Sequence, residues 1–377
     1  EGAAPLAVDQ FGASGMVSYA QNQVTGWWKE DETLIRWGHL DSLHPRRTFA
    51  FQVSLKQARA LQARLARGKR IVLHAIVKAA RHAGMYSVVT ALLPGSDPVL
   101  RNEEIVFSCH LDHQRPGAND NASGCATNLE VARTLAKLVR EGKLPRPSRS
   151  IRFVWPCEIE CTMALLHARP ELRARFRAVI HMDMVGGGPV TKATFHVTRG
   201  PLSLPTFVND VGHAFGAFVN AESDAFASGE GGKYPLVAVG GGKEPLRADL
   251  AEFSMGSDHE VYTESSFRIP AIFLNDWPDR YIHTNFDSPA NIDPTKLQRA
   301  AFIGAASALF LANLRSSDVP VLWSTMQSAM VRRASVMLER RAQLADVEAA
   351  ALTRAYLATE RAALASTREA WAAAISN

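Results

Sequence analysis

Residues 104–124, with the sequence EIVFSCHLDHQRPGANDNASG, decide the fold of this chain. The segment begins as a short apolar run, which is typical of a buried strand, and it ends in a loop rich in Gly, Asn and Asp. A stretch with helical spacing follows at 124–139. A strand, a polar loop and a helix in this order form the repeating unit of proteins with a parallel sheet.

The same alternation continues along the chain and predicts the fold class. Further apolar runs follow the first, and helical stretches such as 205–219 lie between them. We therefore predict an α/β fold, with a mostly parallel mixed sheet flanked by helices in a three-layer sandwich. The predicted strands are 104–110, 150–156, 178–186 and 269–276.

Changes of pattern divide the 377 residues into three parts. Residues 1–84 predict a small α+β lobe, and residues 85–316 predict the main domain. Residues 317–377 are rich in Ala, Leu, Arg and Glu, which predicts a long helix or a helical hairpin. This tail either packs on the domain surface or forms a homo-oligomer contact. The lobe is expected to contain strands at 14–20, 48–55 and 70–80 and a helix at 56–68.

Composition and charge narrow the class of protein. No apolar run approaches the roughly 18 residues that a membrane span needs, so no membrane partner is expected. The net charge is +5, but Lys and Arg are scattered among acidic residues, so nucleic acid is not an expected partner. The four cysteines form no CxxC pair and predict no disulfide scaffold. The compartment is open, and a secreted or periplasmic location is favoured if Glu1 is a processed terminus.

The ends of the predicted strands carry residues that can bind a metal. These residues are His110, Glu158, Glu160, Asp183 and, shortly after the last strand, His283. Ligands of parallel sheets bind beyond the carboxyl ends of the strands, so we expect these side chains to converge. Imidazoles and carboxylates without paired thiolates suit zinc or a similar divalent ion.

Asp120 extends this set. It lies in the segment GANDNASG, whose small residues let the backbone bend and bring the carboxylate close to His110. A carboxylate in that place can bridge two cations, so we expect two ions rather than one.

Five ordered segments resemble the co-catalytic di-zinc aminopeptidase family, whose relatives include glutamate carboxypeptidases and glutaminyl cyclases. The resemblance covers roughly residues 85–315, and residues 12–20, GASGMVSYA, are similar to part of the protease-associated domain. The five segments are HLD with GANDNASG, an acidic strand end, HMDMVGG, GSDHEVY and IHTNFDSPANID.

The resemblance implies a role for each matched residue. His110 and Asp183 would hold one zinc ion, His283 and a glutamate would hold the other, and Asp120 would bridge them. Asp112 would lie beside His110, where a carboxylate fixes the tautomer of a ligand imidazole.

Other positions receive weaker roles. Asp287 would support His283 as Asp112 supports His110, and Ser257, Asp258 and His259 would line the substrate cleft. The remaining histidines singled out match no family position and are expected to be structural: His113, His181, His196 and His213.

The acidic strand end departs from the family pattern. The family shows two adjacent glutamates, the first a general base and the second a zinc ligand, whereas this chain reads CEIECT. Glu158 falls on the base position and Ile159, which cannot bind zinc, falls on the ligand position. Three arrangements stay open: Glu160 replaces the ligand, which we favour; Glu158 coordinates and another group is the base; or the second site is weak or empty. Thiolate ligation by Cys157 or Cys161 is a further alternative.

The resemblance implies a zinc metallopeptidase, an aminopeptidase that acts on peptides. Water activated by the metal would attack the carbonyl, with Glu158 taking its proton and returning it to the leaving amine. Two alternatives stay open: a catalytically impaired homologue that binds peptides or proteins, and a single-zinc transferase similar to glutaminyl cyclases.

Overall fold

The computed structural model describes residues 6–19, 31–40, 48–80, 82–344 and 346–375. A six-stranded sheet forms its centre. The four inner strands are parallel, and the two edge strands run antiparallel to their neighbours. In spatial order the strands are β3 (Val89–Leu93), β5 (Ser150–Trp155), β4 (Glu104–Ser108), β6 (Phe176–Asp183), β8 (Ala271–Trp277) and β7 (Thr194–Thr198).

The predicted α/β fold with a mostly parallel mixed sheet is confirmed. The four predicted strands are the four inner ones, whose side chains are buried on both faces and therefore read as continuous apolar runs. The edge strands β3 and β7 were missed. Most of β3 is exposed, so its sequence lacks the apolar run that marks a central strand.

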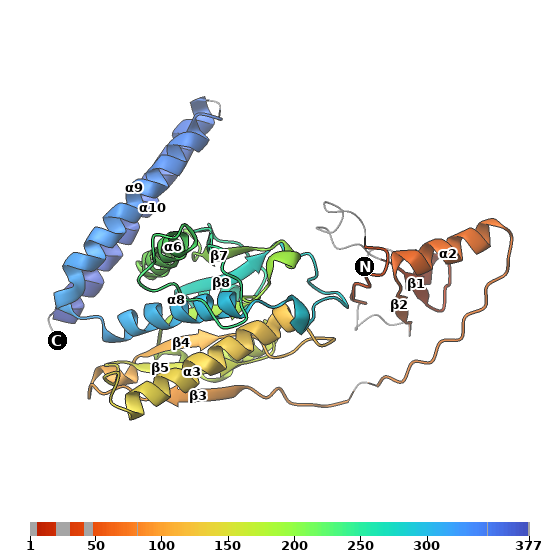
Figure 1. Ribbon diagram of the computed structural model, residues 1–377, viewed down its shortest axis with the longest axis horizontal. Coiled ribbons are helices and arrows are strands. Elements are labelled where there is room, and N and C mark those ends of the chain that lie inside the picture. Colours follow the sequence, from red (N-terminus) through yellow and green to blue (C-terminus); the bar gives the residue numbers. More distant parts are fainter. Residues whose placement is uncertain (1–5, 20–30, 41–47, 81, 345, 376–377) are drawn as a thin grey trace.

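Helices cover both faces of the sheet. In β4, Ile105 and Phe107 face one apolar core and Val106 faces the other, as the two-residue period of a strand requires. Figure 1 shows α3 and α8 lying along the sheet. The first face is covered by α3 (Gly124–Arg140), α6 (Val208–Ala227) and α8 (Pro294–Asn313), and the second by α4 (Glu160–Ala168) and α7 (His259–Thr263).

The N-terminal lobe lies beside the sheet and is joined to it by an extended segment (Figure 1). Its strands β1 (Met16–Ser18) and β2 (Ala50–Gln52) pair in parallel. Its helix α2 (Leu55–Ala66) begins with a capping box formed by Ser54 and Gln57. The first predicted strand and the segment similar to a protease-associated domain both end at Ala20, which lies outside the described residues.

The predicted strand at 70–80 is wrong. These residues have no regular secondary structure, and no described strand pairs with them. Val72 and Ile76 are exposed, so the apolar pattern of this segment is not used for packing within the described chain. A strand without a neighbour gains no hydrogen bonds between strands, so the apolar pattern of residues 70–80 was not sufficient to predict a strand.

Two long helices end the chain. α9 (Val319–Arg341) and α10 (Asp346–Ile375) lie side by side (Figure 1). Arg333 of α9 pairs with Asp210 of α6 at 2.6 Å and with Glu360 of α10 at 2.5 Å, which ties the hairpin to the main domain.

None of the helices in the described part of the chain has both the length and the hydropathy needed to cross a bilayer. The shorter helical elements are η1 (Leu6–Gln10), η3 (Leu100–Asn102), η4 (Ala118–Ser123), α5 (Pro170–Arg173), η5 (Pro189–Thr191), η6 (Pro289–Asn291) and η7 (Ser316–Asp318).

Candidate metal centre

A first group of potential ligands gathers beyond β4 and β6. The Nε2 atom of His110 lies 3.2 Å from Oδ1 of Asp120 and 3.3 Å from Oδ1 of Asp183, and all three residues are buried. Ligands at zinc distances in a tetrahedral site would be separated by about 3.3 Å. We call His110, Asp120 and Asp183 the buried group.

The buried group fits a divalent cation. Neither Nε2 of His110 nor Oδ1 of Asp183 has a hydrogen-bond partner among the described residues. Leaving a buried polar atom without a partner costs about 1–3 kcal/mol, and more when it is charged. A cation between these atoms would remove that cost, and imidazole with two carboxylates is a donor set that zinc accepts.

A second group shares Asp120. The Nε2 atoms of His113 and His283 lie 3.2 Å and 3.0 Å from Oδ2 of Asp120. The two oxygens of this carboxylate thus face different groups, which is the geometry expected of a bridging ligand. We call His113, Asp120 and His283 the open group, because the side chains of both histidines are partly exposed.

His113 was expected to be structural, but the structure places it with Asp120 and His283 in a group that could hold a metal ion. The loop after β4 folds back so that His113 comes within reach of Asp120, seven residues further along the chain. Its place in the run HLDH was the available signal. The conformation of an irregular loop decided the outcome, and periodicity does not predict such conformations.

The loop that carries Asp120 is held in place from several sides. Asp287 accepts hydrogen bonds from the backbone amides of Asn119 at 2.7 Å and Asp120 at 3.0 Å. Asp287 therefore orients Asp120 rather than His283, the residue that it was expected to support. A Cβ atom at Gly117 would lie 1.9 Å from the carbonyl oxygen of Asp120, so the close approach of the backbone requires glycine there.

Asp112 connects His110 with Glu158. The Nδ1 atom of His110 is 3.0 Å from the backbone carbonyl oxygen of Asp112 but 3.7 Å from its carboxylate. The carbonyl is therefore the acceptor that fixes the tautomer of the ring. The carboxylate of Asp112 instead accepts a hydrogen bond of 2.7 Å from the amide of Glu158.

The turn at Glu158 is held by a second carboxylate. Ile159 has a φ of 57°, which is strained for a β-branched residue. Its amide donates to Oδ1 of Asp258 at 2.7 Å, and this bond fixes the turn. Burial raises the pKa of Glu158 to about 8, although His110 opposes the rise. A carboxyl group with such a pKa can take up and return a proton near neutral pH.

Glu160 does not join either group. The chain turns at Ile159, α4 begins at Glu160, and this residue is exposed. The geometry therefore does not support the favoured prediction that Glu160 replaces the missing ligand.

Cys157 and Cys161 form a disulfide with a Cα–Cα distance of 5.0 Å, which the absence of a CxxC pair did not predict. Because their sulfurs are bonded to each other, they offer no thiolate to a metal.

The segment Ser257, Asp258 and His259 lies behind the ligands. Its side chains are fully buried and cannot contact substrate in this structure, which corrects the expectation that they line the cleft. Ser257 donates a hydrogen bond of 2.7 Å to Oδ2 of Asp183. The ring of His259 stacks on Phe273 at a centroid distance of 4.1 Å. Ser257 therefore positions Asp183 of the buried group, whereas His259 packs against the sheet.

The N-terminal lobe reaches the open group. The amide of Trp37 donates to the carbonyl oxygen of His283 at 3.0 Å. The ring of Trp37 lies 3.9 Å from the ring of His283 and 5.7 Å, edge-on, from that of His113. A segment far away in the sequence thus packs on both imidazoles of the open group.

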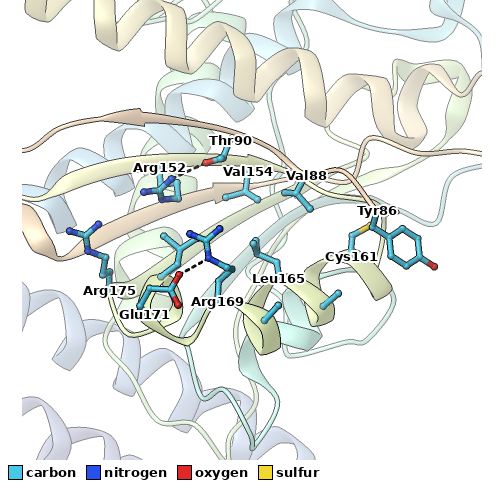
Figure 2. Close-up of a pocket in the computed structure, with 13 residues that line it drawn as sticks. Tyr86, Val88, Thr90, Arg152, Val154, Cys161, Leu165, Arg169, Glu171 and Arg175 are labelled. Atoms are coloured by element: carbon cyan, nitrogen blue, oxygen red, sulfur yellow. Dashed lines mark hydrogen bonds and ion pairs between the residues drawn. The ribbon is translucent and has the colours of Figure 1, made fainter. Parts of the chain in front are cut away.

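Two cavities lie on the main domain. One, of about 850 Å³, adjoins the open group: its lining includes His113 and the apolar side chains of Leu111, Leu129 and Trp155. The other, a groove of about 650 Å³, is bordered by the arginines labelled in Figure 2, and no member of either group lines it. Of these two, the cavity beside His113 is the candidate substrate cleft because it adjoins the open group.

Comparison with known proteins identifies the family. An aminopeptidase of Pseudomonas aeruginosa is 31% identical over 122 residues, which are 30% of this chain and about a fifth (21%) of that protein. A putative peptidase from Clostridium acetobutylicum has a similar fold, with 14% identity, a TM-score of 0.54, and coverage of 82% of this chain and 59% of that chain. A peptidase M28 precursor from Shewanella amazonensis SB2B gives 19% identity, a TM-score of 0.53, and coverage of 80% and 61%. The model of peptidase family M28 matches residues 88–308, which is more than half of the chain, and the chain therefore belongs to this family.

Proposed function

We propose that this protein is a zinc-dependent aminopeptidase that removes N-terminal residues from peptides. The observation that carries the proposal is the position of Glu158, which follows β5 at the same sheet edge as two ligand groups that share Asp120. Membership of family M28 supports peptide hydrolysis. The name of the P. aeruginosa relative supports action at the N-terminus.

The chain supplies positioning and proton transfer. His110, Asp120 and Asp183 would hold zinc, which when bound lowers the pKa of water and polarises a carbonyl group. Glu158 would take a proton from the attacking water and return it to the leaving amine. Two carboxylates hold the turn at Glu158 in place. Asp112 accepts a hydrogen bond from the amide of Glu158, and Asp258 accepts one from the amide of Ile159.

The cavity supports a preference among peptides. Its apolar lining, which includes Leu111, Leu129 and Trp155, would take up an apolar side chain of the N-terminal residue. The disulfide Cys157–Cys161 supports a secreted or periplasmic location, because such bonds persist in oxidising compartments.

The test uses the full chain after removal of metals with a chelator. Leucine p-nitroanilide and its N-acetylated form are offered before and after zinc is restored. We expect zinc-dependent hydrolysis of the free amine only. Hydrolysis that is absent with zinc bound would reject the proposal and favour a binding protein. Cyclisation of an N-terminal glutaminyl peptide would favour the transferase instead.

A further inference from the structure

We propose that His113 replaces the glutamate ligand that this chain lacks, and that with Asp120 and His283 it completes the second of the two cation sites that the family resemblance implies. The proposal deepens the function proposed above and rests on it only in taking the buried group as the first metal site. The second site would consist of two imidazoles and one carboxylate. From its position in the sequence, His113 was expected to be structural.

Distances favour a common ion. The Nε2 atoms of both histidines lie 3.0–3.2 Å from one oxygen of Asp120, and the candidate ligand atoms of the group are all within 4.8 Å of one another. The distances of 3.0–3.2 Å between nitrogen and oxygen are close to the roughly 3.3 Å that separates two ligand atoms of a tetrahedral zinc site. Asp120 is 4% exposed, so its charge is removed from water and needs close positive partners.

The tautomer of His113 is fixed by its other nitrogen. Nδ1 of His113 faces the backbone carbonyl oxygen of Arg115, as Nδ1 of His110 faces that of Asp112. A carbonyl only accepts hydrogen bonds, so Nδ1 carries the hydrogen in both rings. A bare lone pair on Nε2 of His113 would be repelled by Oδ2 of Asp120, so the 3.2 Å contact requires either a proton on Nε2 or a cation between the two atoms. This arrangement matches that of ligand histidines in metal sites.

The environment of the open group suits a catalytic ion. Trp37 packs on both rings and so limits their motion before an ion arrives. The cavity of about 850 Å³ reaches His113, which leaves room for a water or substrate ligand at a further coordination position. Two nitrogens and a carboxylate oxygen favour zinc or cobalt over magnesium or calcium.

The alternative is that His113 only hydrogen-bonds to Asp120 and that the chain holds a single ion. Both arrangements explain the 3.2 Å contact, but they predict different metal stoichiometries. They also predict different effects of a carboxylate at position 113. A carboxylate can replace an imidazole as a ligand, whereas beside Asp120 without a cation it would be repelled.

The experiment is a titration of the metal-free full chain with zinc sulfate and, in parallel, cobalt chloride. Calorimetry gives the affinities, mass spectrometry gives the number of ions per chain, and visible absorption reports the cobalt ligands. We expect two ions in the unaltered protein. His113→Ala should keep the first affinity and weaken the second by more than about 100-fold, because even residues outside the ligand shell change affinity by 10–100-fold.

Two further variants make the result decisive. His113→Glu should recover the second ion, and His74→Ala, which removes an exposed imidazole outside both groups, should bind two ions as before. Unchanged binding of two ions by His113→Ala, or a single ion in the unaltered protein, would overturn the proposal. Because stoichiometry is measured without substrate, two ions without peptide hydrolysis would reject only the proposed function. Hydrolysis with one ion would reject only the role of His113.

Discussion

The two ligand groups share one carboxylate but differ in how the fold supports them. His110 and Asp183 of the buried group stand at or just beyond the ends of central strands. His113 and His283 of the open group stand on loops, and His283 has a φ of 59°. The sheet therefore holds two ligands of the buried group in place, whereas the positions of both histidines of the open group depend on loops and on the N-terminal lobe. We expect the buried group to bind its ion more tightly.

The largest expected effect follows from replacing the shared residue. Asp120→Ala removes a ligand from both groups, so both ions should be lost and peptide hydrolysis should fall to the assay background. Metal analysis after dialysis checks this, with circular dichroism to confirm folding. Retention of two ions by the folded variant would show that Asp120 does not bridge.

The next effect separates catalysis from metal binding. Glu158→Gln should lower kcat/KM by about 10²–10⁴-fold, because it removes a general base, while both ions stay bound. Glu160→Gln makes the same change at an exposed position and should leave kcat/KM unchanged. The reverse outcome for the two variants would restore Glu160 as the functional residue.

Two supporting residues should affect one group each. Ser257→Ala removes the hydrogen bond to Asp183 and should weaken the first ion by about 10–100-fold. Trp37→Leu removes the ring that packs on His283 and should weaken only the second ion. Zinc titration of both variants measures this. If both variants weaken the same ion, the two groups are not supported independently.

His259, which contacts neither ligand group, should affect the stability of the fold rather than metal binding. Burial lowers the pKa of His259 to about 4, compared with roughly 6.5 in the unfolded chain. The unfolded chain therefore binds more protons between these values. The contribution of His259 to stability is complete above pH 6.5 and is lost as the pH falls towards 4, by up to about 3 kcal/mol.

Urea unfolding of the metal-free protein at several pH values tests this prediction. The loss of stability between pH 6.5 and 4 should be smaller in His259→Phe, which keeps an aromatic ring against Phe273. An identical pH dependence in the variant would show that other groups cause the loss.

The parts of the site that lie at the ends of regular strands could be predicted from the sequence, and those that lie on loops could not. His110 and Asp183 could be found because apolar runs mark the central strands and the strand ends converge. Glu160 was misjudged because the turn at Ile159 starts a helix that leaves it exposed. The closeness of His113 to Asp120 was not predicted because it depends on how an irregular loop folds back. The homo-oligomer through the C-terminal helices stays a prediction.

The most direct test of the central claim is a crystal structure of the zinc-bound protein, with anomalous scattering recorded at the zinc absorption edge. The account predicts two peaks, one between His110, Asp120 and Asp183 and the other between His113, Asp120 and His283. A single peak, or a second peak held by Glu160 in place of His113, would contradict it.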